Sequence, residues 1–331
     1  MKKVSLSYFV IGIALHFVWM FLQARRESGL YLAEICDRNI CCTIYLTKTY
    51  KQCLFYIKNK FIKELQIEDK CYRKLEKEFY SFIKEYKYSD EESRVNKTIW
   101  ICWMQGEENA PDLVKACIAS ARENLKDFDV IILSENNITD YITFPDHIIR
   151  KHKEGKISKT HFSDILRIAI LCKYGGLWMD ATVFCTDGDF ADRIIDLPLF
   201  LYKVMNLDQN DEEAIMASSW LISAKSGDHI LMLTRDILYR YWEKHDYLIN
   251  FFLVHLCFAL AARENRDEWD SIPMYNNRSP HTLMFELANS FDQDRWNEIK
   301  KMSSFHKLTR HTEYSNEGTF YRFILDTNKS E

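Results

Sequence analysis

Residues 160–184 read THFSDILRIAILCKYGGLWMDATVF and combine a helical pattern, a glycine pair and a short apolar run. The helical part is apolar on nearly every side, which predicts a buried helix. Its polar exceptions, His161, Asp164 and Arg167, are spaced three apart and therefore share one face. Buried charges are costly unless they are paired or bind a ligand. This face is therefore either an internal Asp164–Arg167 ion pair or one wall of a ligand site.

The whole chain has 331 residues, enough for one large domain with an appendage or for two domains. Its formal net charge of −4 gives no support to nucleic-acid binding, because domains that bind nucleic acids are usually basic. None of the 10 cysteines forms a C-x-x-C pair, so a structural zinc site is not expected and a reducing compartment is the simpler inference. The sequence contains no glycine-rich phosphate loop and no H-E-x-x-H motif, which disfavours kinases and hydrolases.

A mostly apolar run at residues 4–22 lies between two lysines and two arginines. A helix of about 19 residues is roughly 30 Å long, the thickness of the hydrocarbon core of a bilayer. We therefore predict a membrane anchor within residues 1–26, with a helix docked on the protein itself as the alternative. More basic residues follow this run, which would keep the rest of the protein on the cytoplasmic face of the membrane, anchored or peripheral.

The pattern changes near residue 93. Residues 27–92 have apolar positions three and four apart, which predicts a helical region. Residues 97–103 (KTIWICW) and 128–133 (FDVIIL) are typical of buried strands, and Pro111 is well placed to begin a helix between them. Strand, helix and strand at this spacing predict an α/β fold with a mostly parallel sheet flanked by helices.

Polar residues follow the ends of the predicted strands. Trp103 ends the first strand, Ser134 follows the second, and Asp180 ends the short run after the glycine pair. Ligands of parallel sheets bind at the carboxyl ends of the strands, so we expect these residues to meet at one edge. The α/β domain is predicted to occupy residues 93–312, followed by a C-terminal tail at residues 313–331.

Two acidic segments compete as metal ligands. A divalent metal requires oxygen ligands fixed at the end of a rigid element, which Asp180 supplies after its strand. Asp187 and Asp189 spell D-x-D, but they lie in a turn-like segment where Asp and Gly serve backbone geometry. We therefore favour Asp180.

The residues from His161 to Asp180, H-F-S-D-I-L-R-(x7)-G-G-L-W-M-D, resemble the S-D-x-x-R…G-G-x-Y-x-D-x-D signature of sugar-nucleotide glycosyltransferases. That signature occurs in glycosyltransferase family 32 and in clostridial glucosylating toxins. The D-A-T ending, the W-x-Q-G after the first strand and a late HKLT element are most similar to the capsular polysaccharide synthesis protein branch. The resemblance covers roughly residues 97–310.

The resemblance implies a GT-A fold, a nucleotide diphosphate sugar as donor, and Mn²⁺ or Mg²⁺ as a divalent cation. It implies that Trp103 lies near the nucleotide base. Asp164 and Arg167 would contact the ribose and the donor sugar. Gly175 and Gly176 would let the backbone approach the donor closely.

The resemblance makes Asp180 the first acid of the D-x-D motif and a catalytic residue together with Arg167 and Asp164. The second acid, the usual direct metal ligand, is replaced by Thr182, whose neutral hydroxyl is a poorer ligand for a hard cation. His306 and Lys307 of the late element would contact the donor diphosphate, where a cation offsets charge on the leaving group. An ordinary exposed basic tail is the alternative for these two residues.

These features predict a membrane-associated glycosyltransferase that moves a hexose to a capsular or other surface polysaccharide or a glycolipid, with retention of configuration. Thr182 motivates the alternative of a catalytically inactive scaffold that binds nucleotide sugars, and a transferase that glycosylates a protein is a third possibility. Trp220 lies in a segment that resembles the sugar- and acceptor-binding strand of the family, with core packing as its alternative. His255 is interpreted as a core histidine rather than a catalytic base.

Overall fold

The computed structural model describes residues 63, 66–89, 93–203, 214–275, 277–310 and 317–327. The chain divides into two compact units, residues 1–67 and residues 68–331, and nearly all described residues belong to the second. The predicted anchor lies outside the described residues. None of the helices that the structure describes is long and apolar enough to cross a membrane.

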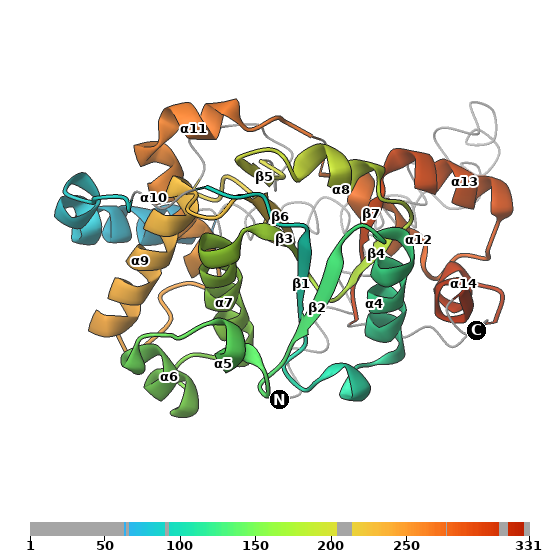
Figure 1. Ribbon diagram of the computed structural model, residues 1–331, viewed down its shortest axis with the longest axis horizontal. Helices are drawn as coiled ribbons and strands as arrows, with labels where there is room; N and C mark the ends of the chain where they lie inside the picture. The colour runs from blue at the N-terminus through green and yellow to red at the C-terminus, as the bar shows by residue number, and fades with distance from the viewer. Residues whose placement is uncertain are drawn as a thin grey trace, which may run out of the picture. The chain divides into compact units, whose positions relative to one another are not determined.

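A five-stranded mixed sheet lies at the centre of the second unit, in the order β2-β1-β3-β6-β5 (Figure 1). β1 (Thr98–Cys102) lies parallel to both of its neighbours, β2 (Asp129–Leu133) and β3 (Gly176–Met179). β6 (Leu221–Ala224) and β5 (Leu199–Leu201) extend the sheet beyond β3 with antiparallel pairings. The predicted α/β fold is confirmed, and its sheet is mixed because the chain returns through β5 and β6.

Both faces of this sheet are covered, because alternate side chains of each strand point to opposite faces. Ile99 and Ile101 of β1 belong to a cluster with α4 (Asp112–Asn124) and α8 (Asp189–Ile194). Trp100, between them, belongs to the larger cluster on the opposite face. That larger cluster includes three long helices: α7 (Lys159–Tyr174), α9 (His229–Lys244) and α10 (Leu253–Glu264).

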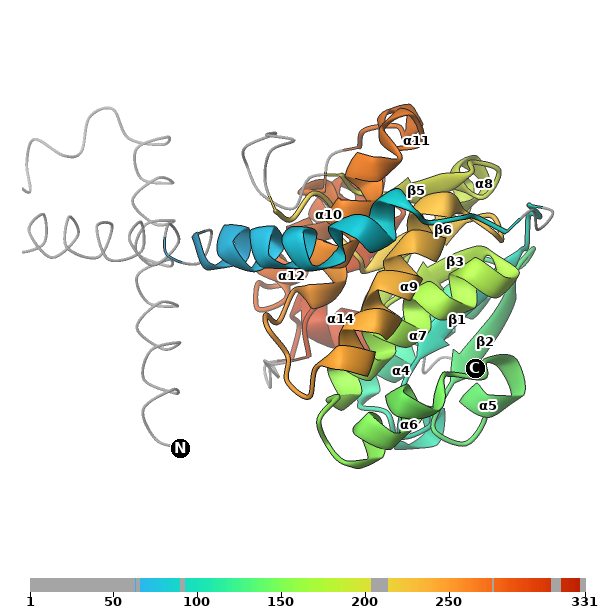
Figure 2. The same ribbon diagram turned by 90° about the vertical axis from the view of Figure 1, so that its left-hand side faces the viewer.

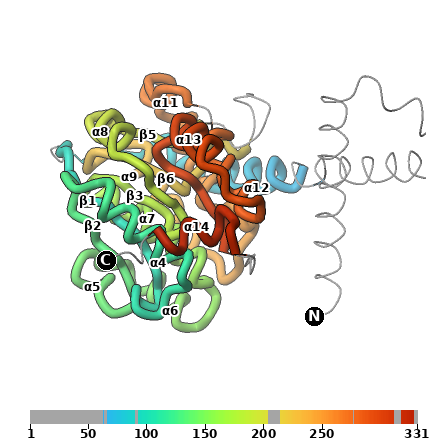
Figure 3. The backbone as a smooth tube through the Cα atoms, turned by 90° about the vertical axis from the view of Figure 1, so that its right-hand side faces the viewer, coloured from blue at the N-terminus to red at the C-terminus, as the bar shows by residue number. Residues whose placement is uncertain are grey.

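A small two-stranded ladder lies beside the main sheet. It pairs β4 (Val183–Cys185), directly after the Asp180 segment, with β7 (Phe305–Lys307) in antiparallel register. Around it lies a third apolar cluster that contains residues of α4 and of the last helices. Figure 3 shows the backbones of these last helices, coloured orange to red. The remaining helices are α5 (Ile138–Tyr141), α6 (Asp146–Lys153), α11 (Arg266–Ser271), α12 (Thr282–Glu286), α13 (Gln293–Met302) and α14 (Phe320–Thr327), with 3-10 turns at η1 (Glu107–Asn109) and η2 (Ser279–His281).

The helical residues 68–84 pack on the same core as the sheet (Figure 2). Leu75 and Phe79 are fully buried in the larger cluster, and the Tyr86 hydroxyl donates to Asp236 of α9 at 2.6 Å. The compact unit thus begins at residue 68, ahead of the boundary predicted at residue 92. Part of the predicted C-terminal tail is likewise packed, because α14 buries Phe320 and Ile324 in the third cluster.

Candidate functional site

A cavity of about 250 Å³ opens where β1 and β3 end. Its walls come from the segments after these two strands, from the N-terminal half of α7 and from Arg310 after β7. Five of the predicted site residues line it: Trp103, Asp164, Arg167, Asp180 and Thr182. Residues more than 75 positions apart in the sequence are therefore brought to one edge of the sheet, as the strand ends predicted.

The buried helix α7 supplies one wall. It begins after Ser158, whose hydroxyl accepts from the backbone N–H of His161 at 3.2 Å, and it ends at Gly175 with a φ of 68°. His161, Asp164 and Arg167 share one face, and the Arg167 guanidinium lies 3.2 Å from the Asp164 carboxylate. The internal ion pair exists, and it forms part of the cavity wall at the same time. The two interpretations of the polar face are therefore compatible.

Arg167 is almost completely buried and joins the helix to the strand end. Its Nη2 donates to Asp180 Oδ1 at 2.8 Å, and its Nη1 donates to the Ser219 hydroxyl at 2.6 Å. The guanidinium also lies 5.0 Å from the ring centre of Trp178. A single cation is thus shared between Asp164 and Asp180, which fixes both carboxylates.

Asp180 is surrounded by donors. Its Oδ1 accepts from Arg167 and from the Trp178 indole N–H at 3.1 Å, and its Oδ2 lies 3.2 Å from Lys307 Nζ. Burial alone would raise the pKa of Asp180, but the charges of Arg167 and Lys307 outweigh burial and hold its pKa below the ordinary value. The carboxylate is therefore ionised at neutral pH.

His306 and Lys307, the two residues predicted to contact a diphosphate, are neighbours on β7 and point to opposite faces of the β4–β7 ladder. Lys307 Nζ donates to Thr182 Oγ1 at 2.6 Å and thus contacts two residues that line the cavity. His306, its neighbour on the strand, points to the other face, where Nε2 lies 3.5 Å from Thr186 Oγ1. His306 is fully buried, and burial lowers its pKa to about 4. The structure brings Lys307 to the site and leaves His306 in the core.

The glycine pair lies at the far end of β3 from Asp180. A Cβ on Gly175 would lie 2.7 Å from the backbone nitrogen of Ser226, and one on Gly176 would lie 2.5 Å from the carbonyl oxygen of Thr98. Both glycines have positive φ, 68° and 99°, which disfavours side chains. They allow α7 to turn closely into the sheet, and they do not line the cavity.

The Trp103 indole gives the cavity an aromatic wall. Its Nε1 is buried and has no hydrogen-bond partner among the described residues, and the Arg310 guanidinium lies 5.5 Å from its ring centre. The sequence did not lead us to Arg310, Ser219 or Trp178. The sequence could have indicated Trp178, because residues i and i+2 of an extended chain lie on the same side and Trp178 is two residues before Asp180. Ser219 and Arg310 lie in segments that only the folded chain brings to this edge.

Trp220 and His255 do not line the cavity. Trp220 is buried, stacks on Tyr202 with ring centres 5.0 Å apart, and donates from its indole to Asn277 at 3.2 Å. Burial lowers the pKa of His255 to about 4, so this ring is neutral at physiological pH. Asp187 and Asp189 line a different cavity of about 420 Å³, away from Asp180.

The oxygen atoms around Asp180 do not fit the divalent cation that the resemblance implies. Mg²⁺ at a phosphate site is bound by the free oxygens of one or two carboxylates, and water and phosphate oxygens complete its coordination. Here both oxygens of the one strand-end carboxylate already accept from Arg167, Trp178 or Lys307, and Thr182 offers only a hydroxyl that accepts from Lys307. No group of three or more His, Cys, Asp or Glu side chains suited to a metal occurs in the part of the chain that the structure describes.

The sequence of this chain matches a known protein family. Residues 51–324 match the family described as capsular polysaccharide synthesis protein. The chain is similar to the O-glycosyltransferase braB of Annulohypoxylon truncatum, with 25% identity over 161 residues, which are 45% of this chain and 38% of that protein. The match thus spans well under half the length of that curated relative.

Two solved structures are also similar at low identity. The PaToxG glycosyltransferase has a TM-score of 0.38 and 12% identity over 81% of this chain and 97% of that one. The bacterial N-acetylglucosamine transferase NleB has a TM-score of 0.29 and 12% identity over 58% of this chain and 92% of that one. Because the family match covers far more than half of its length, this chain belongs to the capsular polysaccharide synthesis protein family.

Proposed function

We propose that this protein is a glycosyltransferase that moves a hexose from a nucleotide diphosphate sugar to a capsular or other surface polysaccharide or a glycolipid. The observation that carries the proposal is the linked set of Asp164, Arg167 and Asp180, which line the cavity at the strand ends, and Lys307, which pairs with Asp180. Family membership supports the same reaction class.

The residues around the cavity suit the three parts of such a donor. Trp103 offers a flat apolar face for a nucleotide base and an indole N–H that has no hydrogen-bond partner among the described residues. Lys307 and Arg310 are cations beside the cavity, where a diphosphate would be attracted. Asp164 and Asp180 are oriented carboxylates, which are good acceptors for sugar hydroxyls.

Retention of configuration is part of the proposal. Asp180 is held by Arg167, Trp178 and Lys307, so its oxygens are poorly available as a nucleophile. In the reaction we propose, the bond between the anomeric carbon and the diphosphate oxygen breaks, and the acceptor oxygen forms the new bond on the same face. The acceptor proton passes to the leaving diphosphate. The protein then contributes positioning and electrostatic stabilisation.

The acceptor is expected at a membrane surface. The apolar run at residues 4–22 supports an anchor or a peripheral position on the cytoplasmic face. Surface polysaccharides and glycolipids are the acceptor classes in keeping with the name of the family.

The test is binding and turnover with a panel of nucleotide diphosphate hexoses. We expect one donor to bind by calorimetry and to be hydrolysed or transferred, and Asp180→Asn to abolish turnover while the thermal unfolding midpoint changes little. Arg193→Lys on α8, outside the cavity, is the matched control and should behave as wild type. If no donor binds, or if Asp180→Asn turns over normally, the assignment of this site is wrong.

Thr182 favours a second candidate function. With a hydroxyl in place of the second acid, the site could bind a nucleotide sugar without transferring it. Tight binding of a donor with no turnover on any glycan, glycolipid or protein acceptor would identify such a scaffold.

A further inference from the structure

We propose that Lys307 takes the place of the divalent cation, and that its ammonium group stabilises the donor diphosphate in a reaction that needs no metal. This inference rests on the proposed function and concerns the same site. It follows from the disagreement between the cation implied by the family and the atoms that surround Asp180.

The ammonium group of Lys307 lies where a metal bound by a D-x-D pair would be held. Its Nζ is 3.2 Å from Asp180 Oδ2 and 2.6 Å from Thr182 Oγ1, the two side chains at the first and third positions of the motif. An ammonium has three N–H donors. Among the described residues, Asp180 and Thr182 take two of these N–H groups, which leaves the third for a phosphate oxygen.

Backbone pairing at Lys307 and at the next residue fixes where this lysine lies relative to Thr182. Lys307 pairs with Val183 in the β4–β7 ladder, and the next residue, Leu308, donates its N–H to the carbonyl oxygen of Thr182 at 2.8 Å. The lysine is therefore attached on both sides to the segment that carries Thr182. A donor fixed in this way does not have to reorganise as charge develops on the leaving group.

The local charge balance also requires this cation. Arg167 is shared between Asp164 and Asp180, so these three groups together carry one net negative charge. Lys307 cancels that charge, and Arg310 on the Trp103 ring adds a cation at the edge of the cavity. Without Lys307, a diphosphate would face an uncompensated carboxylate.

The same contacts explain why Thr182 is compatible with activity. A carboxylate at this position would bring a second negative charge next to Asp180 and would call for a divalent cation. The hydroxyl accepts a hydrogen bond from Lys307 and adds no charge. Threonine at position 182 and lysine at position 307 are thus a matched pair.

The experiment compares full-length wild type, Lys307→Met, Lys307→Arg and the control Lys301→Met, on the exposed face of α13, after dialysis against EDTA. We expect wild type and Lys301→Met to turn over the donor equally with and without Mn²⁺. Lys307→Met should lose roughly 10²–10³-fold, the usual effect of removing one electrostatic donor, and Mn²⁺ should not restore it. Lys307→Arg, which keeps the charge, should retain part of the activity.

Two readouts independent of turnover accompany the assay. Mn²⁺ titration followed by electron paramagnetic resonance should detect no ion bound to the wild-type protein in the absence of nucleotide. Calorimetry in EDTA should detect binding of the nucleoside diphosphate that is lost or weakened at least tenfold in Lys307→Met.

Turnover that disappears in EDTA and returns with Mn²⁺, or a tight Mn²⁺ site in the wild type, would overturn the inference and leave the proposed function intact. Absence of turnover under all conditions would instead overturn the proposed function. In that case the two binding readouts still decide the role of Lys307: metal-free diphosphate binding that depends on Lys307 supports it, and binding that requires Mn²⁺ refutes it.

Discussion

Arg167 is the residue through which the helix wall and the strand end of the cavity are connected. Its Nη1 lies near Asp164 and donates to Ser219, and its Nη2 donates to Asp180, an arrangement that the planar guanidinium permits from one buried position. Lysine would keep the charge and lose this geometry. The residue therefore combines a structural and an electrostatic role.

Replacing Arg167 by lysine should lower donor turnover by roughly 10²-fold, because Asp180 would lose one fixed partner and the sugar would be positioned less well. Initial rates at saturating donor would measure the effect, and circular dichroism would check the fold. The matched control is Arg240→Lys, whose guanidinium lies over the Phe82 ring on the other side of α9. A rate within twofold of wild type for Arg167→Lys would contradict the role given to this residue.

His306 lies next to Lys307 on β7, yet its chemistry is the opposite. Burial disfavours the charged ring and lowers its pKa from 6.5 to about 4, although the nearby Asp187 carboxylate acts in the other direction. Between these two pH values, His306 therefore binds a proton in the unfolded chain and remains neutral in the folded protein. The stability contributed by this neutral ring is present above pH 6.5 and is lost as pH falls towards about 4.

At about 1.4 kcal/mol for each pKa unit, this residue can remove up to about 3 kcal/mol of stability on acidification. His306→Gln should therefore make the free energy of unfolding less sensitive to pH between about 7 and 4. Urea unfolding at a series of pH values measures this slope. An unchanged slope for His306→Gln would mean that the His306 pKa is the same in the folded and the unfolded protein.

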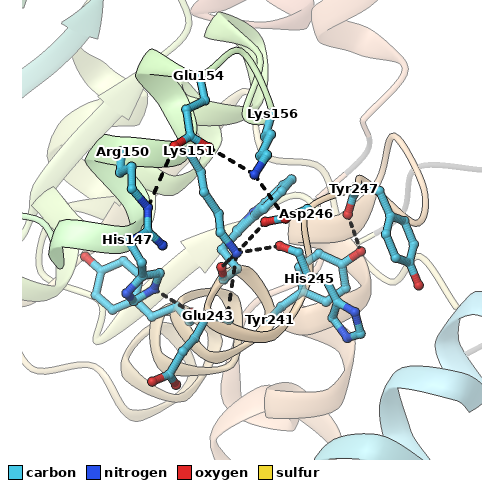
Figure 4. Close-up of polar contacts among 12 residues, drawn as sticks. His147, Arg150, Lys151, Glu154, Lys156, Tyr241, Glu243, His245, Asp246 and Tyr247 are labelled. Atoms are coloured by element: carbon cyan, nitrogen blue, oxygen red, sulfur yellow. Dashed lines mark hydrogen bonds and ion pairs between the residues drawn. The ribbon is translucent and has the colours of Figure 1, made fainter.

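At the scale of elements, α6 and α9 are joined by a buried lysine (Figure 4). Lys151 of α6 donates to the carbonyl oxygens of Trp242, Glu243 and His245, with the last at 2.8 Å, and pairs with Asp246 at 2.9 Å. These carbonyl groups lie at the C-terminal end of α9. The last carbonyl oxygens of a helix have no hydrogen-bond partners within it, and a nearby cation stabilises them.

This contact matters for the cavity because α9 supports α7. Trp242, in the last turn of α9, donates from its indole to Nε2 of His161 at 3.0 Å. The other ring nitrogen of His161 lies 3.6 Å from Asp164. The end of α9 thus helps to place the polar face of α7.

Lys151→Met should lower the free energy of unfolding by about 2–3 kcal/mol, because it leaves helix carbonyls without their charged donor. Chemical denaturation measures the change. The control is Lys156→Met: Lys156 also pairs with Asp246, at 3.0 Å, but it is more exposed, so its removal should have little effect. Equal effects of the two substitutions would show that the buried contacts of Lys151 carry no extra stability.

At the scale of the whole molecule, residues 68–89 belong to the same compact unit as the sheet. Phe79 is 1% exposed and packs in the cluster that also contains Trp100, Trp178 and the long helices. The adjacent Tyr80 is 59% exposed. Truncations that begin at the predicted boundary near residue 93 would remove part of this core.

Phe79→Ala should lower the free energy of unfolding by about 3–5 kcal/mol, the usual effect of deleting a buried phenyl ring, in one cooperative transition. Denaturation followed by near-UV and far-UV circular dichroism tests this. Tyr80→Ala should differ little from wild type. If Phe79→Ala produced two separate transitions, residues 68–89 would form an independent unit.

Local sequence determined much of the site. The i, i+3 spacing of Asp164 and Arg167 requires a shared helix face, because the helical repeat is a property of the backbone. The run before Asp180 is short and apolar, as is typical of a buried strand, so the sequence predicted Asp180 at the end of such a strand. The α/β alternation was readable for the same reason, since each element carries its own hydrophobic period.

Tertiary structure alone decided the rest. Lys307 reaches Thr182 because β7 pairs with β4 across more than 100 residues, and strand register then turns His306 into the core. The glycine pair was expected beside the ligand, but neighbouring backbones on the sheet occupy the space where its side chains would lie. Pairing, register and close packing depend on which distant segments meet, and no local pattern specifies those partners.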